Sequence, residues 1–183
     1  LLVAVRGRQL TAATSFPGAP RLAGKAPSRN LSETALMVTF DDVRAFLASE
    51  TGLAVVGTVR ADGTVLSSVV NCGPVDHPVT GEPSVAFVSI GAAARLGHIR
   101  RGSAVTVTVR RGWRWVSVTG PADLVGPVDL PDGFGADDLR VLLRLVFHAA
   151  GGVHDDLEEY DRAIADECRV VVLVRPDRIL GNA

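Results

Sequence analysis

The chain has 183 residues, a formal net charge of −1 and a hydrophobic fraction of 47%. This length indicates one domain with a sizeable core, and no apolar run approaches the ~20 residues that a membrane-spanning helix needs. The near-zero net charge gives no overall attraction to nucleic acid or to an anionic membrane. Lys25 is the only lysine, which excludes lysine-based catalysis in the part of the chain that is expected to fold.

The first 36 residues differ in composition from the rest. Up to Ser32 they contain no acidic residue, and their basic residues are scattered among Gly, Pro, Ser and Ala. Met37 is the only methionine, and patterning typical of a fold begins directly after it. We expect residues 1–36 to be a disordered N-terminal extension, which an overlong start assignment explains better than a transit peptide, and residues 37–183 to form one folded domain.

The first predicted elements are a helix and a hairpin. Thr39 and Asp42 have the spacing of a capping box and precede an apolar stripe, which predicts a helix over residues 40–49. Residues 53–59 form a short β-branched run, and residues 64–71 follow it after an Ala-Asp-Gly turn signal. We expect these two runs to pair as antiparallel strands.

The middle of the chain predicts three further strands and a short helix. Residues 72–82 contain two glycines and two prolines, so we expect a loop that cannot continue a strand ladder. A third strand, over residues 85–90, leads through a Gly/Ala turn into a helix over residues 92–100. Valine alternates with threonine or arginine over residues 105–110, which predicts a strand. After a tight turn, the fifth strand covers residues 113–119.

The last third of the chain combines two helices with one strand. An amphipathic helix is indicated by apolar residues at the spacing i, i+3, i+4, i+7 and i+8, namely Leu139, Leu142, Leu143, Val146 and Phe147. A second helix has its apolar stripe at Leu157, Tyr160 and Ile164, and the final strand covers residues 170–174. Six strands in antiparallel hairpins with few helices favour a mainly β, closed or partly closed barrel with flanking helices.

One candidate for ligand binding is a helix start with a nearby arginine. Arg95 lies about one turn into the predicted short helix, whose start at residues 89–93 offers unpaired backbone amides. Such a start binds phosphate or carboxylate through its N–H groups and its partial positive charge, and arginine adds a bidentate fork. A Gly/Ala-rich helix start also occurs without a ligand, so both interpretations stay open here.

Two serines interrupt the second strand of the first hairpin. Ser67 and Ser68 place one hydroxyl on each face, so one of them is expected to point into the barrel wall. A hydrogen-bonded strand serine is the more frequent explanation. A hydroxyl that contacts a phosphate or a ring carbonyl is the functional alternative.

The two tryptophans of the chain, Trp113 and Trp115, share one strand face. Core packing is the usual role of such a pair. Their arginine neighbours favour a solvent-reachable or interfacial edge instead, because several cations do not bury readily.

Metal and hydrolytic chemistry have little support. The acidic cluster that follows His154 is explained equally well by the start of a helix, so we expect no metal site. No nucleophile elbow, zinc-protease, Walker or Rossmann motif is present. Cys72 and Cys168 lack metal-ligand spacing and do not form a disulfide framework, which makes a reducing cytoplasm the default location.

Four separated blocks carry a family resemblance. They are residues 58–70 (TVRADGTVLSSVV), 88–101 (VSIGAAARLGHIRR), 110–124 (RRGWRWVSVTGPADL) and 146–182, in which a Gly-Val-His-Asp turn precedes a Tyr-bearing helix and a final strand. In these blocks and their spacing the chain resembles the pyridoxamine 5′-phosphate oxidase-like, FMN-binding split-barrel family. Within that family it is most similar to actinobacterial oxidoreductases that use the deazaflavin coenzyme F420. The resemblance implies a homodimer of six-stranded antiparallel split barrels with two cofactor sites at the subunit interface.

The resemblance also implies roles for nine residues. Those lining the cofactor ring and ribityl chain would be Leu66, Ser67, Ser68 and Val69. Those holding the phosphate region would be Ser89, Arg95 and His98. The aromatic residues arriving from the partner chain would be Trp113 and Trp115. No residue stands out as a general acid, so the catalytic residue is left unassigned.

Several positions depart from the family pattern. Relatives often have a basic residue where this chain has Ala93, a lysine where it has Arg95 and an asparagine where it has His98. A proline and a glutamine common in the hairpin are replaced by Val65 and Leu66. Fewer polar side chains would therefore reach the cofactor ring and tail.

The leading hypothesis is a cytoplasmic oxidoreductase in which reduced F420 hands a hydride to a conjugated organic acceptor. The second keeps the fold and uses FMN, as an oxidase or flavin reductase. A non-enzymatic alternative, a small barrel that stacks single-stranded nucleic acid on its tryptophans, is opposed by the near-zero net charge. A cofactor-binding module without turnover is a further alternative that the sequence does not separate from the first.

Overall fold

The computed structural model describes residues 38–49 and 52–183. The N-terminal extension predicted for residues 1–36 lies outside the described residues. In the part that is described, no helix has both the length and the apolar character needed to cross a membrane.

The described residues contain four helices and eight strands. The helices are α1 (Phe40–Ala48), α2 (Ala94–Arg100), α3 (Ala136–Ala149) and α4 (Leu157–Asp166). The strands are β1 (Leu53–Val59), β2 (Val65–Asp76), β3 (Pro83–Ser89), β4 (Val105–Arg111), β5 (Arg114–Gly120), β6 (Ala122–Val125), β7 (Val170–Val174) and β8 (Arg178–Gly181). They form one sheet in the order β6-β7-β3-β2-β1-β4-β5-β8, with every neighbouring pair antiparallel.

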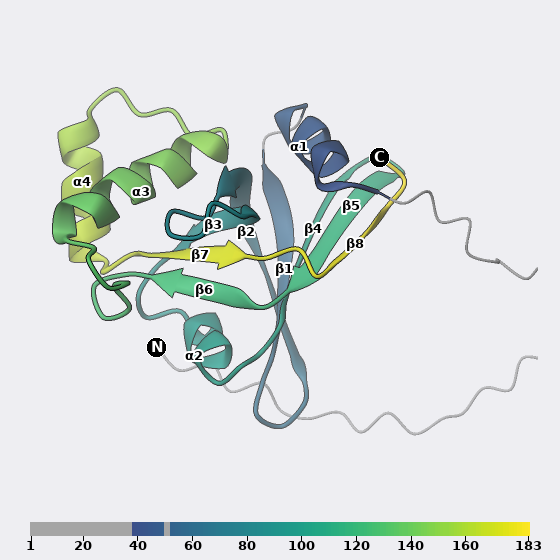
Figure 1. Ribbon diagram of the computed structural model, residues 1–183, viewed down its shortest axis with the longest axis horizontal. Helices are drawn as coiled ribbons and strands as arrows, with labels where there is room; N and C mark the ends of the chain where they lie inside the picture. Colours follow the sequence, from purple (N-terminus) through teal and green to yellow (C-terminus); the bar gives the residue numbers. More distant parts are fainter. Residues whose placement is uncertain (1–37, 50–51) are drawn as a thin grey trace, which may run out of the picture. The chain divides into compact units, whose positions relative to one another are not determined.

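The sheet consists of two halves that share β2 (Figure 1). The first half of β2 pairs with β1, ending where Asn71 faces Leu53. The second half pairs with β3, beginning where Cys72 faces Phe87. Because β2 changes partner between Asn71 and Cys72, β1 and β3 diverge on either side of it. This divergence is the split in the barrel.

The predicted capping box at the start of α1 is confirmed. The Asp42 amide donates to Thr39 Oγ1 at 3.3 Å, and the Thr39 amide donates to Asp42 Oδ2 at 2.8 Å. The helix buries Val43, Phe46 and Leu47 in the core that fills the barrel. Local capping and an apolar stripe together account for this element.

The alternating pattern of the barrel strands is also confirmed. In β4, Val105, Val107 and Val109 are buried, while the residues between them are more exposed. The same alternation holds in β1 and β5. One face of these strands therefore packs into the barrel core, and the other faces outward.

A loop over residues 72–82 was predicted, and this is wrong for its first five residues. β2 continues to Asp76, with Gly73 and Pro74 inside the ladder with β3. Beyond Asn71, β2 has no partner on the side of β1, so a proline lacking an N–H is tolerated there. Gly73 is required for a different reason: a Cβ at this position would lie 2.1 Å from the carbonyl oxygen of Ala149, at the end of α3.

Two short strands were not anticipated, so the count is eight rather than six. β6 follows Pro121, and β8 follows Pro176. At both prolines the chain crosses from one half of the sheet to the other, since β5 and β8 belong to one half and β6 and β7 to the other. The two crossings touch: a Cβ on Gly120 would lie 1.9 Å from the carbonyl oxygen of Arg175.

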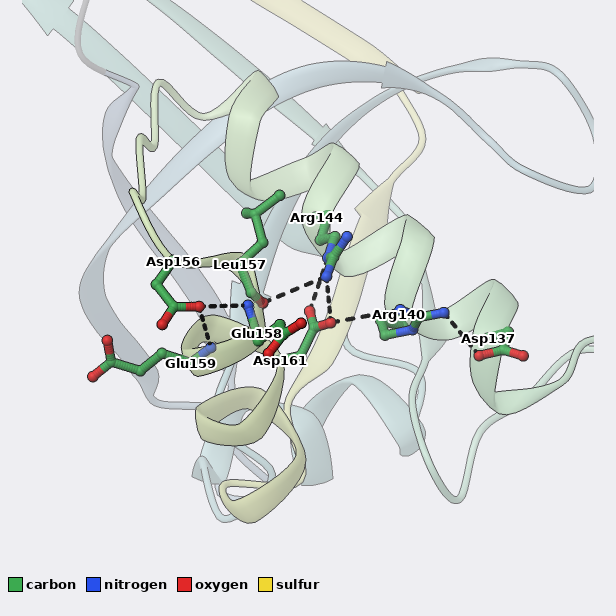
Figure 2. A network of polar contacts seen from close by, with 8 residues as sticks. All are labelled: Asp137, Arg140, Arg144, Asp156, Leu157, Glu158, Glu159 and Asp161. Atoms are coloured by element: carbon green, nitrogen blue, oxygen red, sulfur yellow. Dashed lines mark hydrogen bonds and ion pairs between the residues drawn. The ribbon is translucent and has the colours of Figure 1, made fainter.

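Helices α3 and α4 cover the half of the sheet formed by β2, β3 and β7. Four of the five residues of the α3 stripe predicted from the sequence are buried in a second core together with Tyr160 and Ile164 of α4, and the fifth, Phe147, is partly buried against it. Arg144 of α3 forms a bidentate ion pair with Asp161 of α4, which Figure 2 shows at the centre of a polar network. The hydrogen bonds from Arg144 hold the pKa of Asp161 below its usual value.

The close approach at Gly73 gives a stability prediction. Gly73→Ala is expected to lower the free energy of unfolding by at least about 2 kcal/mol, because the new methyl group meets backbone that cannot move aside. Gly97→Ala in α2 is the control, since its Cβ would have no heavy-atom neighbour nearer than the Arg101 side chain at 3.5 Å. Urea unfolding measures both variants, and equal stability of the two would contradict the close packing of α3 on β2.

Candidate functional site

The candidate residues on β2 alternate between the two faces of the sheet, as predicted for the two serines. Leu66 and Ser68 are partly buried, and they pair with Thr58 and Val56, which are buried in β1. Ser67 and Val69 are exposed on the opposite face. The structure thus places Leu66 and Ser68 on the inner side of the split, and it places the other two on the outer sheet face.

His98 lies beside the same end of β1. It is 7% exposed, and its Nδ1 is 2.9 Å from Oγ1 of Thr58, which is 1% exposed. The Thr58 hydroxyl has no other partner among the described residues, so donation to Nδ1 is the arrangement that leaves no buried proton unsatisfied. The imidazole then carries its proton on Nε2.

Arg95 is a partly buried cation without a counter-charge. Its guanidinium carbon lies 5.9 Å from the centre of the Phe87 ring, and it makes no hydrogen bond or ion pair with any described residue. Burial lowers the pKa of Arg95 below its ordinary value. A partly desolvated guanidinium that lacks a carboxylate is costly unless a ligand supplies the negative charge.

Ser89 occupies the end of β3 next to this cation. It is buried on the same side of the strand as Phe87, and its hydroxyl makes only a long contact of 3.5 Å to the carbonyl of Ile90. Ser89 and Arg95 therefore both lie near Phe87, at the edge of the barrel core. The Ser89 hydroxyl could therefore donate a shorter hydrogen bond to a ligand oxygen than it donates to the Ile90 carbonyl.

The backbone amides expected to be free before α2 are partly in use. The Gly91 amide donates to the Glu167 carbonyl at 3.0 Å, and the Ala93 amide donates to the Ile90 carbonyl at 3.0 Å. α2 has only seven residues and no side-chain cap at its start. The capacity of this region to bind an anion therefore rests on its side chains rather than on the helix start.

The tryptophans lie at the other end of the sheet. The fifth strand was predicted to begin at Trp113, but β5 begins at Arg114, so Trp113 lies in the turn before it and is 94% exposed. Trp115, within β5, is 36% exposed. Asn182 fixes this turn, since its side chain donates to the Trp113 carbonyl at 2.9 Å and accepts from the Trp115 amide at 2.8 Å.

These indoles cannot reach Arg95 within one chain. The tryptophan turn follows Arg111, the last residue of β4. The first residue of β4, Val105, pairs with Thr58, which lies beside His98. The turn and α2 are therefore at opposite ends of β4. Seven strand residues span about 20 Å. Figure 1 shows the same separation, with α2 at one end of β1 and the C-terminus, next to the tryptophan turn, at the other.

An apolar surface covers the outer face of β2, β1, β4, β5 and β8. One row across these five strands consists of Val69, Val55, Thr108, Ser117 and Leu180. Its three apolar members are between 46% and 60% exposed, and Trp115 lies two residues before Ser117 on the same face. The buried residues of the described helices belong to two cores that contain none of these side chains. We call this surface the outer sheet face.

Metal chemistry finds no support in the described part of the chain, which contains no group of three or more potential metal ligands. The two cysteines are both free, and they differ in exposure. Cys72 is fully buried, and burial raises the pKa of its thiol to about 12. Cys168 is exposed.

The sequence matches no family model, and it matches no curated protein. Solved structures do match. A conserved hypothetical protein of Mycobacterium tuberculosis is similar with a TM-score of 0.60 and 16% identity, over 81% of this chain and 87% of that one. A "putative 5-nitroimidazole antibiotic resistance protein" of Bacteroides thetaiotaomicron has a TM-score of 0.55 and 12% identity, over 76% of this chain and 81% of that one. Putative pyridoxamine 5′-phosphate oxidases match with TM-scores below 0.5.

The chain has a split-barrel fold, mainly β and antiparallel with four described helices, which it shares with the solved structures from Mycobacterium tuberculosis and Bacteroides thetaiotaomicron. The fold predicted from the sequence resemblance is therefore confirmed, apart from the two added strands. A protein named F420 reductase matches with 22% identity and a TM-score of 0.48, over 73% of this chain and 93% of that one.

The cysteines allow a direct test of burial. At pH 8 the folded protein should react with a disulfide reagent at Cys168 only, because a thiol with a pKa of about 12 provides almost no thiolate and Cys72 is also inaccessible. Cys168→Ser should abolish the reaction of the folded protein, whereas Cys72→Ser should leave it intact. Unfolding in denaturant should release the second thiol, and rapid reaction of both thiols before unfolding would contradict the packing around Cys72.

Proposed function

We propose that the protein is an oxidoreductase that binds the deazaflavin coenzyme F420 at the split of the barrel and uses it to reduce a conjugated organic acceptor. The observation that carries this proposal is Arg95, a partly buried guanidinium without an acidic partner in the described part of the chain. Such a cation fits an anionic group of a ligand. The four sequence blocks that resemble deazaflavin-dependent oxidoreductases supply the identity of that ligand.

The side chains around Arg95 fit the anionic arm of a cofactor. Ser89 offers a buried hydroxyl with a poor internal partner, and His98 offers an N–H on Nε2. Arg95 supplies the charge. In this proposal the three residues hold the phosphate region together, and the lysine and asparagine of relatives are replaced by Arg95 and His98.

The ring of the cofactor would lie along β2. Leu66 and Ser68 face the inner side of the split, where a methyl-rich surface and one hydroxyl can orient a flat ring. Ser67 and Val69 are on the outer sheet face, so they would reach a cofactor only where a second subunit covers that face. When bound, the deazaflavin supplies the hydride, and the chain's residues position the ring and exclude water.

We further propose that the protein is a homodimer formed through the outer sheet face. Exposed valines and a leucine on a sheet face that no described helix covers are typical of an interface. A two-fold axis running across the strands would set the tryptophan turn of one subunit against the split of the other. Trp113 and Trp115, which do not reach the site of their own chain, would then cover the partner's cofactor.

FMN is the second candidate, because Arg95, Ser89 and His98 would accept its phosphate in the same way. The two cofactors differ in their spectra. Protein that purifies yellow with a flavin spectrum favours FMN, and colourless protein that binds added deazaflavin favours F420.

Removal of the cation tests the site. Arg95→Ala should weaken F420 binding, followed by fluorescence, by at least roughly tenfold, because a charge-assisted hydrogen bond to the anionic arm is lost. Arg95→Lys should retain part of the affinity. Arg162→Ala, which removes an exposed arginine from α4, is the control and should bind as the unmodified protein does.

The same titration with FMN decides between the cofactors. Absence of saturable binding of either cofactor to the purified protein would refute the proposed function. Unchanged affinity in Arg95→Ala would refute the assignment of Arg95 to the anionic arm.

A single charge on the outer sheet face tests the dimer. Val69→Arg should convert a particle of twice 19.2 kDa into one of 19.2 kDa, because an arginine within the interface would be buried without a partner. Val141→Arg places the same charge on an equally exposed position of α3 and should leave the mass unchanged. Light scattering after size-exclusion chromatography measures both, and an unmodified protein that is monomeric at all concentrations would exclude the dimer.

A further inference from the structure

A cavity of about 440 Å³, which shares His98 with the proposed cofactor site, opens at the C-terminal end of α2, beside the end of β1. Its polar lining consists of Arg60, His98, Arg101 and Ser103, and none of its lining residues is acidic. Arg95, which carries the proposed cofactor site, does not line it. Two arginines without a carboxylate around one small cavity give it a positive potential.

Arg101 is the cation with the least internal compensation in this cavity. Its guanidinium makes no hydrogen bond or ion pair with any residue in the described ranges. The adjacent Arg100 behaves differently, since it forms a bidentate pair with Asp129 at 3.0 and 2.6 Å. The two consecutive arginines at the end of α2 therefore differ in role. Arg100 connects α2 to the loop before α3 through Asp129, and Arg101 is available to a ligand in the cavity.

Arg60 adds a second positive charge that is positioned by the first hairpin. Its guanidinium donates to the Thr64 hydroxyl at 3.2 Å and to the Val65 carbonyl at 3.1 Å, and neither of these acceptors is charged. The neighbouring carboxylate, Asp62, accepts from the Thr64 amide and hydroxyl at 2.9 and 2.7 Å. The hairpin thus holds Arg60 in place without neutralising it by a direct ion pair.

His98 contributes a fixed donor. Its Nδ1 accepts from the buried Thr58 hydroxyl at 2.9 Å, so its proton is on Nε2, on the other side of the ring. The ring lines the cavity and is 7% exposed. With Nδ1 accepting from Thr58, the Nε2–H has no acceptor in the described part of the chain and can donate to a ligand oxygen in the cavity that the ring lines.

We propose that this cavity binds an oxyanion, a phosphate or carboxylate group, between the Nε2–H of His98 and the guanidinium of Arg101, with Arg60 at the rim. Arg95 lies in the first turn of α2 and Arg101 directly follows its last residue, about 9 Å away along the helix axis. One ligand with two anionic groups could therefore occupy both places. If the oxyanion is the second anionic group of F420, this assignment rests on the proposed function. If it is a free anion, the assignment is independent of the proposed function.

The first experiment uses inorganic pyrophosphate as the probe, in a chloride buffer of constant ionic strength. Calorimetry should show saturable binding to the full chain, and the Nε2 resonance of His98 should shift as the site fills. Arg101→Gln should weaken this binding by at least roughly tenfold, whereas Arg162→Gln should leave it unchanged. The proposal is overturned when Arg101→Gln changes the binding of neither probe: pyrophosphate here, and F420 in the second experiment.

The second experiment distinguishes the source of the anion. F420 is compared with its ring fragment, the deazaflavin that lacks the phosphate and everything beyond it. Loss of affinity for F420 but not for the fragment in Arg101→Gln identifies the oxyanion as part of the cofactor. Loss of pyrophosphate binding alone identifies a free anion.

The two proposals fail in different ways. Unmodified protein that binds pyrophosphate through Arg101 but neither F420 nor FMN would refute the proposed function and leave the oxyanion cavity intact. Protein that binds F420 through Arg95 but responds to Arg101→Gln with neither probe would refute the cavity alone. Circular dichroism of each variant confirms that the fold is retained, so a loss of binding reports on the site.

Discussion

The change of partner within β2 is the constraint on which the rest of the structure depends. Up to Asn71 this strand belongs with β1, and from Cys72 it belongs with β3. A sheet that divides in this way encloses a core. Core residues fill the inside of the barrel, and the barrel is open where β1 and β3 separate. Leu66 and Ser68 lie at that opening from one side, and Ser89 lies there from the other. The candidate cofactor site is therefore a result of strand pairing, and the short helix α2 adds the charged side chains to it.

The arginines of the described chain fall into two groups, and the difference is informative. Arg100 and Arg144 are bound to carboxylates and connect elements of the fold. Arg95 and Arg101 are at opposite ends of α2 and have no carboxylate. Arg95 is partly buried, and burial without compensation is unfavourable, whereas the exposed Arg101 matters through the cavity that it lines together with Arg60 and His98. This contrast is the physical reason for placing a negatively charged ligand along α2 rather than at one of the other basic surfaces.

Much of the fold could be predicted from the sequence, because many elements have strong local signals. The capping box of α1, the stripe of α3 and the valine alternation of β4 each determine an element with little help from distant residues. The continuation of β2 was missed because Gly73 and Pro74 are typical of loops. Both are tolerated in this strand for tertiary reasons: α3 packs on the glycine, and β1 no longer flanks the proline. β6 and β8 have four residues each and form only because β7 and β5 are already in place beside them. Within the site, the opposite orientations of Ser67 and Ser68 follow from strand geometry, whereas the hydrogen bond between Thr58 and His98 joins residues 40 positions apart and has no local signal.

The position of β7 has a consequence for how the chain acquires its structure. This strand comes after both β3 and β6 in the chain, yet it lies between them in the sheet. During synthesis on the ribosome, both of these neighbours must wait with unsatisfied backbone edges until residues 170–174 emerge. The half of the barrel nearest α3 and α4 can therefore close only after residues 170–174 have been translated, and a nascent chain that stalls before this point would expose edges prone to aggregation.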